Sequence, residues 1–141
     1  MQQGERDVSD AVAVLVVEDD RLIQAMIEDA LSDGGFQSAV TTSGEEAIEL
    51  LQSNESHYRA IITDINLVGR RNGWDVAQRS REIDPSMPII YMTGTHAEDW
   101  ASRGVPNSVL LTKPFAPAQL VTALSNLLNA QAPSAERPDQ G

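Results

Sequence analysis

Four short apolar runs in the chain each end abruptly at a side chain that can take part in chemistry. The runs consist mainly of β-branched and aliphatic residues, as expected for strands buried on both faces of a parallel sheet. They cover residues 12–17, 58–63, 88–92 and 109–112, and they are followed by Glu18-Asp19-Asp20, Asp64, Thr93 and Lys113. Open parallel sheets bind their ligands at the carboxyl ends of the strands. Carboxylates, a hydroxyl and an amine gathered at that edge could handle a metal ion and a phosphoryl group.

The segments between these runs have helical periodicity. Apolar residues recur at helical spacing over residues 21–33, and Gly34-Gly35 then ends the segment. A short strand is expected over 36–40, and further helices are expected after Ser43, over about 73–83, after Thr95 and from Pro117. Ser43 with Glu46, and Thr95 with Glu98, match the capping-box pattern. This alternation predicts an α/β fold, a doubly wound five-stranded parallel sheet with helices on both faces.

One domain is expected over residues 11–131. The polar and charged residues 1–10 predict a disordered N-terminal tail, and the composition of residues 132–141 predicts a disordered C-terminal tail.

The composition excludes several classes of function. A net charge of −11 argues against nucleic acid as the main partner, because phosphate backbones are bound by basic patches. The absence of cysteine excludes disulfides, thiolate metal sites and a cysteine nucleophile. No apolar stretch approaches the ~20 residues needed to span a bilayer, and the N-terminus lacks the pattern of a signal peptide. We therefore expect a cytoplasmic protein without a membrane partner.

Taken one at a time, the groups after the apolar runs are ambiguous. Glu18-Asp19-Asp20 could bind Mg²⁺, which prefers one or two carboxylates plus phosphate oxygens, or could complement the dipole of the next helix. Asp64 could cap a loop or act as a nucleophile, since carboxylates do form aspartyl phosphates. Lys113 is the sole lysine among ten basic residues, and it could also be an ordinary surface side chain.

The joint pattern is more informative than its parts. The chain contains Val14-Leu15-Val16-Val17-Glu18-Asp19-Asp20, Ile62-Thr63-Asp64-Ile65-Asn66, Tyr91-Met92-Thr93-Gly94 and Lys113-Pro114-Phe115, in this order. With these motifs the sequence resembles the receiver domain of two-component response regulators over roughly residues 11–130. The resemblance implies the flavodoxin-like strand order 2-1-3-4-5.

The resemblance also implies a role for each matching residue. Asp64 would be the phosphoacceptor and Mg²⁺ the cofactor. Thr93 would hydrogen-bond a phosphoryl oxygen, and Lys113 would pair with Asp64 and then with the phosphoryl group. The implied metal ligands are Asp19, Asp64, the backbone carbonyl of Asn66 and, through water, Glu18. Asp20 falls one place past the acidic pair and is expected to be a helix cap.

The implied partners are proteins. The phosphoryl donor would be a sensor histidine kinase or a histidine phosphotransfer protein. Beyond assisting its own phosphorylation and dephosphorylation, the chain is not expected to be an enzyme. Output would reach a downstream protein through the last two helices and the fifth strand, which could also form a homodimer. Too few residues follow position 130 for an output domain, so a stand-alone regulator is expected.

Three positions distinguish this chain within the resemblance. Asn66 and Thr95, each two places after a site residue, are expected to tune the lifetime of the phosphoryl group. Leu110 stands where receivers often place the Tyr or Phe that reads out the switch. The loop over 67–73 is one residue longer than in the commonest pattern. The resemblance further implies a cis Lys113-Pro114 peptide bond.

Two other interpretations remain open. One is a receiver-like interaction module that does not accept phosphate, against which the intact Asp19, Asp64, Thr93 and Lys113 argue. The other is a phosphatase of the haloacid dehalogenase type, which also uses Asp, Thr and Lys on a parallel sheet. That class needs Asp-x-Asp after the first strand, and Glu18-Asp19-Asp20 does not provide it.

Overall fold

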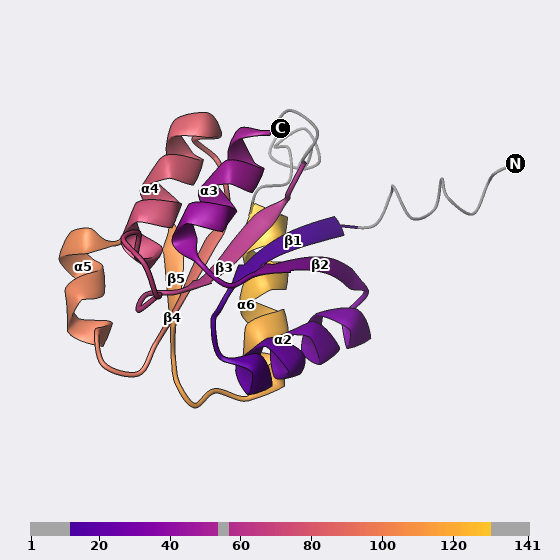
Figure 1. Ribbon diagram of the computed structural model, residues 1–141. Coiled ribbons are helices and arrows are strands. Elements are labelled where there is room, and N and C mark those ends of the chain that lie inside the picture. The colour runs from indigo at the N-terminus through magenta and orange to yellow at the C-terminus, as the bar shows by residue number, and fades with distance from the viewer. Residues whose placement is uncertain (1–11, 54–56, 131–141) are drawn as a thin grey trace, which may run out of the picture.

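The computed structural model of the protein describes residues 12–53 and 57–130, so both predicted tails lie outside the described residues. Five strands form one parallel sheet in the order β2-β1-β3-β4-β5 (Figure 1), which confirms the predicted topology. The strands are β1 (Val12–Val17), β2 (Phe36–Thr41), β3 (Ala60–Asp64), β4 (Ile89–Thr93) and β5 (Ser108–Thr112). β3 and β4 begin at residues 60 and 89, later than the predicted 58 and 88, and each ends one residue later than predicted, at Asp64 and Thr93.

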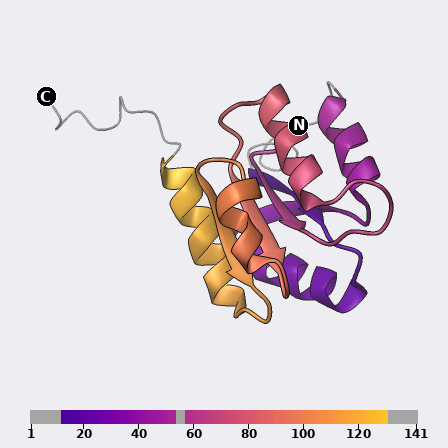
Figure 2. The ribbon, with the colours of Figure 1, turned by 90° about the vertical axis from the view of Figure 1, so that its left-hand side faces the viewer.

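Helices cover both faces of the sheet. Helices α2 and α6 pack on one face, and α3, α4 and α5 pack on the other (Figure 1). In the view of Figure 2, α5 lies toward the viewer, with α6 on one side and α3 and α4 on the other. The helices are α2 (Arg21–Asp33), α3 (Gly44–Gln52), α4 (Gly73–Ile83), the 3₁₀ turn η1 (Ala97–Asp99), α5 (Trp100–Arg103) and α6 (Pro117–Ala130).

The central strands carry most of the core. Every residue of β3 and β4 is buried, which explains why their sequences read as unbroken apolar runs. Burying each large aliphatic side chain there contributes roughly 1.5–3 kcal/mol to folding before entropy is counted. The sheet is therefore a rigid base for the groups at its carboxyl edge.

Local side-chain chemistry fixes where α2 begins and ends. Asp20 is its N-cap, as predicted, since Oδ1 accepts the N–H groups of Leu22 at 2.9 Å and Ile23 at 3.2 Å. Gly35 follows the helix with φ of +90°, a conformation that favours glycine. The cap places the start of α2 directly after the acidic residues that follow β1.

Of the two predicted capping boxes, the one at Ser43 is half formed and the one at Thr95 is absent. Ser43 Oγ accepts the N–H of Glu46 at 3.1 Å, but the Glu46 carboxylate accepts the N–H of Thr42 instead of Ser43. The box predicted at Thr95 is wrong, because neither η1 nor α5 has a side-chain N-cap. The N–H of Thr95 donates instead to the hydroxyl of Thr93, so a side chain of β4 holds the start of this segment in place of a helix cap.

Strand register brings the polar residues of the carboxyl edge together. Val17 of β1 lies beside Thr63, and Thr93 lies beside Thr112, so the residues after β1 and β5 approach the end of β3. Gly73 packs directly on that end, where a Cβ atom would lie 2.3 Å from the carbonyl oxygen of Asp64. Only glycine permits α4 to begin this close to Asp64.

Candidate functional site

Lys113 joins two carboxylates at the carboxyl edge of the sheet. Its Nζ donates to Glu18 Oε1 at 3.1 Å and to Asp64 Oδ2 at 3.2 Å. Glu18 is 1% exposed and Asp64 is 7% exposed, whereas Lys113 reaches in from the loop after β5. The Lys113-Pro114 peptide bond is cis, as the resemblance implies. The three side chains thus meet at the carboxyl ends of three different strands, although they are far apart in the sequence.

Burial dominates the electrostatics of this cluster. Desolvation raises the pKa of the Glu18 carboxyl and of the Asp64 carboxyl, and the positive charge of Lys113 offsets only part of this effect. Burial disfavours the charged form of Lys113, but the two carboxylates outweigh it and raise the pKa of the amine. Keeping both carboxylates charged in this buried cluster therefore costs free energy, and a bound cation would reduce that cost.

Asp19 completes a group of three carboxylates. One ligand oxygen from each of Glu18, Asp19 and Asp64 lies within 4.8 Å of the others. Three negative charges and the charge of Lys113 leave −2, which a divalent cation would balance. All donors are hard oxygens, the type that Mg²⁺ prefers. In charge and donor type, these residues fit Mg²⁺.

Two loops border the three carboxylates. In the loop after β3, the N–H of Val68 donates to Asp19 Oδ2 at 3.3 Å. In the loop after β4, Thr93 Oγ1 accepts the N–H groups of Thr95 at 3.1 Å and His96 at 2.8 Å. Asp19 and Thr93 thus lie at the same edge of the sheet, and each accepts hydrogen bonds from a neighbouring loop.

The two predicted tuning residues contact each other across these loops. Asn66 Nδ2 lies 3.5 Å from Thr95 Oγ1, at the limit for a hydrogen bond, and both residues are exposed. Their placement at the rim brings them within reach of a molecule that enters the site.

Leu110 is half-buried on β5 and lies directly beside Tyr91 of β4. An aromatic side chain is therefore present at this level of the sheet, but on the neighbouring strand. The sequence patterns did not single out Tyr91, although Tyr91 stands two residues before Thr93 and so shares its face of the strand.

The sequence also did not point to Glu45 of α3, whose carboxylate accepts the N–H of Arg70 at 2.8 Å. No local pattern marks that contact.

Comparison with known proteins agrees with the fold and the geometry. The response regulator receiver domain family matches residues 14–125, most of the chain. The chain therefore belongs to this family of two-component signalling domains.

Solved structures and curated sequences show the same similarity. A response regulator receiver protein from Sinorhizobium medicae is 45% identical, with a TM-score of 0.84 over 86% of this chain and 98% of that one. The response regulator MprA of a Mycobacterium species is 28% identical over 91% of this chain and 55% of its own length. The sensor kinase CckA of Brucella abortus is 27% identical over 89% of this chain and 13% of its own length.

The chain thus spans about half the length of MprA and a small part of the kinase. Similar domains occur in both response regulators and sensor kinases. Among the described residues, no helix is long and apolar enough to cross a membrane.

Proposed function

We propose that the protein is a phosphoacceptor, which takes a phosphoryl group onto Asp64 in the presence of Mg²⁺. The observation that carries this proposal is the position of Lys113, whose Nζ lies within 3.2 Å of both Asp64 and Glu18 while Asp19 completes the oxygen cluster. Phosphoryl transfer needs positioning and charge stabilisation more than covalent help, and these residues supply both.

The donor in this proposal is a phosphohistidine of a sensor histidine kinase or a histidine phosphotransfer protein. An Asp64 carboxylate oxygen attacks phosphorus, the P–N bond breaks, and the electron pair stays with the imidazole nitrogen. Lys113 then pairs with a phosphoryl oxygen, and the Thr93 hydroxyl donates a hydrogen bond to another. Because phosphohistidine is formed from ATP, this exchange is proposed to take place in the cytoplasm.

Mg²⁺ would neutralise charge that develops on the transferring group. We assign Asp19 and Asp64 as its direct protein ligands, together with the backbone carbonyl of Asn66. Glu18 would bind through water, since its Oε1 atom accepts from Lys113 and its Oε2 atom accepts the N–H of Asp20 at 3.0 Å. Both of its oxygens therefore already have protein partners.

Asn66 and Thr95 are proposed to set the lifetime of the phosphoryl group, including its loss by hydrolysis. Both lie at the rim, where they can admit or obstruct an attacking water molecule. Asn66→Arg and Thr95→Ala should change the dephosphorylation rate, and unchanged rates would contradict this role.

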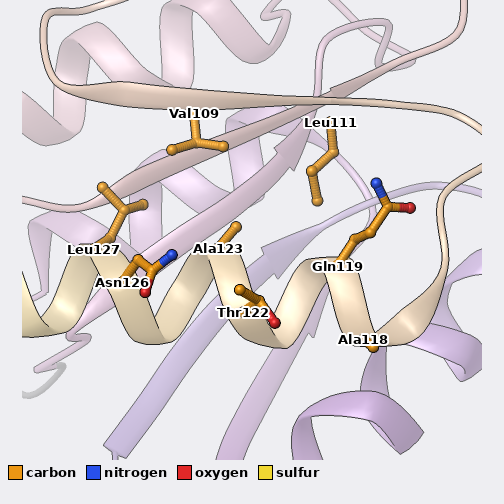
Figure 3. A pocket seen from close by; sticks show the side chains of 8 residues that line it. All are labelled: Val109, Leu111, Ala118, Gln119, Thr122, Ala123, Asn126 and Leu127. Carbon is orange, nitrogen blue, oxygen red and sulfur yellow. The ribbon is translucent and has the colours of Figure 1, made fainter.

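Output is proposed to pass through α5, β5 and α6 to a downstream protein. β5 is one of the two edge strands of the sheet, and an apolar groove of about 560 Å³ is lined by residues of β5 and α6. Figure 3 shows Val109 and Leu111 of β5 pointing into this groove toward Ala123 and Gln119 of α6. A homodimer through the same face is a second outcome, which light scattering with and without phosphorylation would distinguish.

The direct test is incubation of the full chain with acetyl phosphate, with and without Mg²⁺, followed by a phosphate-affinity gel. We expect a Mg²⁺-dependent shift for the wild type and for Asp29→Asn, an exposed aspartate on α2 that serves as control. Asp64→Asn should show no shift. A shift in Asp64→Asn equal to the wild type would exclude Asp64 as the acceptor. A wild type that remains unlabelled even with a cognate kinase would favour the interaction module that does not accept phosphate.

A further inference from the structure

The segment between β4 and β5 is tied at both ends to hydroxyl groups of the same strand. At its start, Thr93 Oγ1 accepts the N–H groups of Thr95 and His96. At its end, the hydroxyl of Tyr91 accepts the N–H of Val105 at 3.0 Å. Tyr91 and Thr93 are two residues apart on β4, so both side chains point to the face that α5 covers. One strand face thus holds both ends of the segment that contains η1 and α5.

The Tyr91 side chain is locked in the core. It is 0% exposed, and its ring packs on Trp74 with centroids 4.8 Å apart and planes tilted by 55°. The guanidinium of Arg103, the last residue of α5, lies 5.4 Å from the centroid of the Trp74 ring. Rotation of Tyr91 would leave a cavity in a close-packed interior, which costs several kcal/mol for a large side chain. This aromatic ring is therefore built to stay in place.

Further contacts fix the end of the segment that Tyr91 holds. The indole Nε1 of Trp100 donates to Ser108 Oγ at 2.9 Å, and Ser108 Oγ donates to the carbonyl of Val105 at 2.6 Å. A Cβ atom at Gly104 would lie 2.5 Å from the Trp100 ring, so glycine permits that ring to fold back on the chain. Both backbone polar groups of Val105 therefore have partners, one on β4 and one on β5.

The start of the segment has fewer attachments. Gly94 and Thr95 are exposed, and a Cβ atom at Gly94 would meet nothing within 4 Å. The two backbone hydrogen bonds of this turn that reach β4 both end on the Thr93 hydroxyl. Movement of that one oxygen would release both N–H groups together.

We infer that Tyr91 is a positioning residue that acts as a fixed hinge for η1 and α5, whereas Thr93 is their releasable attachment. This inference rests on the proposed phosphorylation of Asp64. When Thr93 turns toward a phosphoryl oxygen, Thr95 and His96 lose their acceptor. The start of the segment then moves, while the end stays on Tyr91. The readout therefore uses a fixed aromatic residue on β4, beside Leu110, and needs no rotating aromatic residue on β5.

Nuclear magnetic resonance on the full chain can test this hinge. The chain has two tryptophans, so its spectrum has two indole N–H signals, and Trp100→Phe assigns them. With Mg²⁺ and beryllofluoride, a phosphoryl mimic, we expect large shifts of the Thr95 and His96 amides, whereas the Trp100 indole should shift little because it stays bonded to Ser108. The Val105 amide should keep its protection from hydrogen exchange. Loss of Val105 protection on activation of the wild type would overturn the inference.

Tyr91→Phe removes the hydroxyl and keeps the ring, and Tyr58→Phe changes the other tyrosine of the chain as a control. Without activator, Tyr91→Phe should exchange the Val105 amide roughly tenfold faster, as expected for one lost hydrogen bond. On activation, the Trp100 indole should shift at least twice as far as in the wild type, because the loosened end then moves with the start of the segment. Tyr58→Phe should leave both readouts unchanged. If Tyr91→Phe does not fold by circular dichroism, the wild-type measurement decides alone, because loss of Val105 protection on activation overturns the inference.

Labelling with acetyl phosphate separates the two possible failures. An unlabelled wild type is a failure of the proposed function, and the inference fails with it. Equal labelling of the wild type and Tyr91→Phe, together with equal Trp100 shifts, would overturn the hinge alone.

Discussion

Two loops border the same three carboxylates, but different chemistry holds each of them. The loop over residues 66–72 is held by charge: Asp19 accepts the N–H of Val68, and Glu45 accepts the N–H of Arg70. The loop over residues 94–96 is held by a neutral hydroxyl, that of Thr93. Charged acceptors form the stronger hydrogen bonds, but they also respond to pH and to cations.

This difference indicates that the two loops respond to different events. Asp19 is both the acceptor for Val68 and a proposed metal ligand, so Mg²⁺ and the first loop share its oxygens. Thr93 is not part of the carboxylate cluster. We therefore expect the conformation of the second loop to stay the same when the metal binds and to change when the phosphoryl group is transferred. Metal binding would then change the first loop, and phosphoryl transfer would change the second loop, although both lie at the same edge of the sheet.

The largest effect is expected from Lys113→Met, which removes the cation on which the whole edge depends. Glu18 and Asp64 would face each other without a cationic partner, and breaking a buried ion pair costs about 3 kcal/mol or more. Partial exposure of Lys113 places this variant at the low end of that range. Urea denaturation in a metal chelator measures the loss, and Mg²⁺ should restore part of it. Unchanged stability in the chelator would show that the carboxylates do not depend on Lys113.

A smaller effect with the opposite sign is expected from Asp64→Asn. Because burial raises the pKa of Asp64, the folded state binds its proton more tightly than the unfolded state does. Metal-free wild type therefore loses stability as the pH rises from the ordinary value of 3.8 through the raised one, and Asp64→Asn escapes this loss. The difference in melting temperature between the two proteins should grow over that window and then level off.

Mg²⁺ should reduce this difference in melting temperature by stabilising the wild type more than Asp64→Asn. A ligand at one hundred times its dissociation constant stabilises the folded state by about 2.7 kcal/mol, and only the wild type retains the full set of ligands. A variant that gains as much stability as the wild type would show that the metal binds elsewhere. Thermal melts at several Mg²⁺ concentrations decide between these outcomes.

Much of the fold could be predicted because burial on both faces leaves continuous apolar runs in the sequence. β1, β3 and β4 were located in this way, and the helix bounds of α2 and α4 agree with the prediction. Asp20 was recognisable as a cap because capping acts within three residues, over a distance that sequence patterns cover. Local rules failed at Thr95, where a hydroxyl from the preceding strand took the place of the cap.

The parts that could not be predicted are contacts between distant segments. Glu45 with Arg70, Asp19 with Val68 and Tyr91 with Val105 join different elements through single hydrogen bonds to backbone N–H groups. A backbone N–H is the same in every residue but proline, so its partner leaves no trace in residue type or spacing. The order of the polar strand ends indicated the site, whereas the supports of its loops required coordinates.

A local effect is expected from Thr93→Val, which removes the acceptor of the second loop and keeps the side-chain shape. The N–H groups of Thr95 and His96 would lose a partner worth roughly 1 kcal/mol each. Hydrogen exchange of these two amides should accelerate, while Mg²⁺ affinity stays at the wild-type value. Thr93→Ser restores the hydroxyl and should restore protection. A changed Mg²⁺ affinity in Thr93→Val would show that the two loops are not independent.

The smallest effect is expected from Glu45→Gln, which weakens the outer attachment of the first loop. Hydrogen bonds from the backbone of Arg70 and its neighbours lower the pKa of the exposed Glu45 carboxyl, so this attachment holds above pH 4.5 and is lost as the pH falls through the lowered value. The Arg70 amide should exchange a few-fold faster in the variant. Mg²⁺ affinity should fall slightly, because the same loop also contacts the proposed metal ligand Asp19 through the N–H of Val68.

Glu46→Gln is the matched control. It removes the same charge one residue later, but the Glu46 carboxylate accepts from the N–H of Thr42 and not from the loop. Equal effects of the two variants would assign the change to the charge of α3, and an effect of Glu45→Gln alone would assign it to the loop.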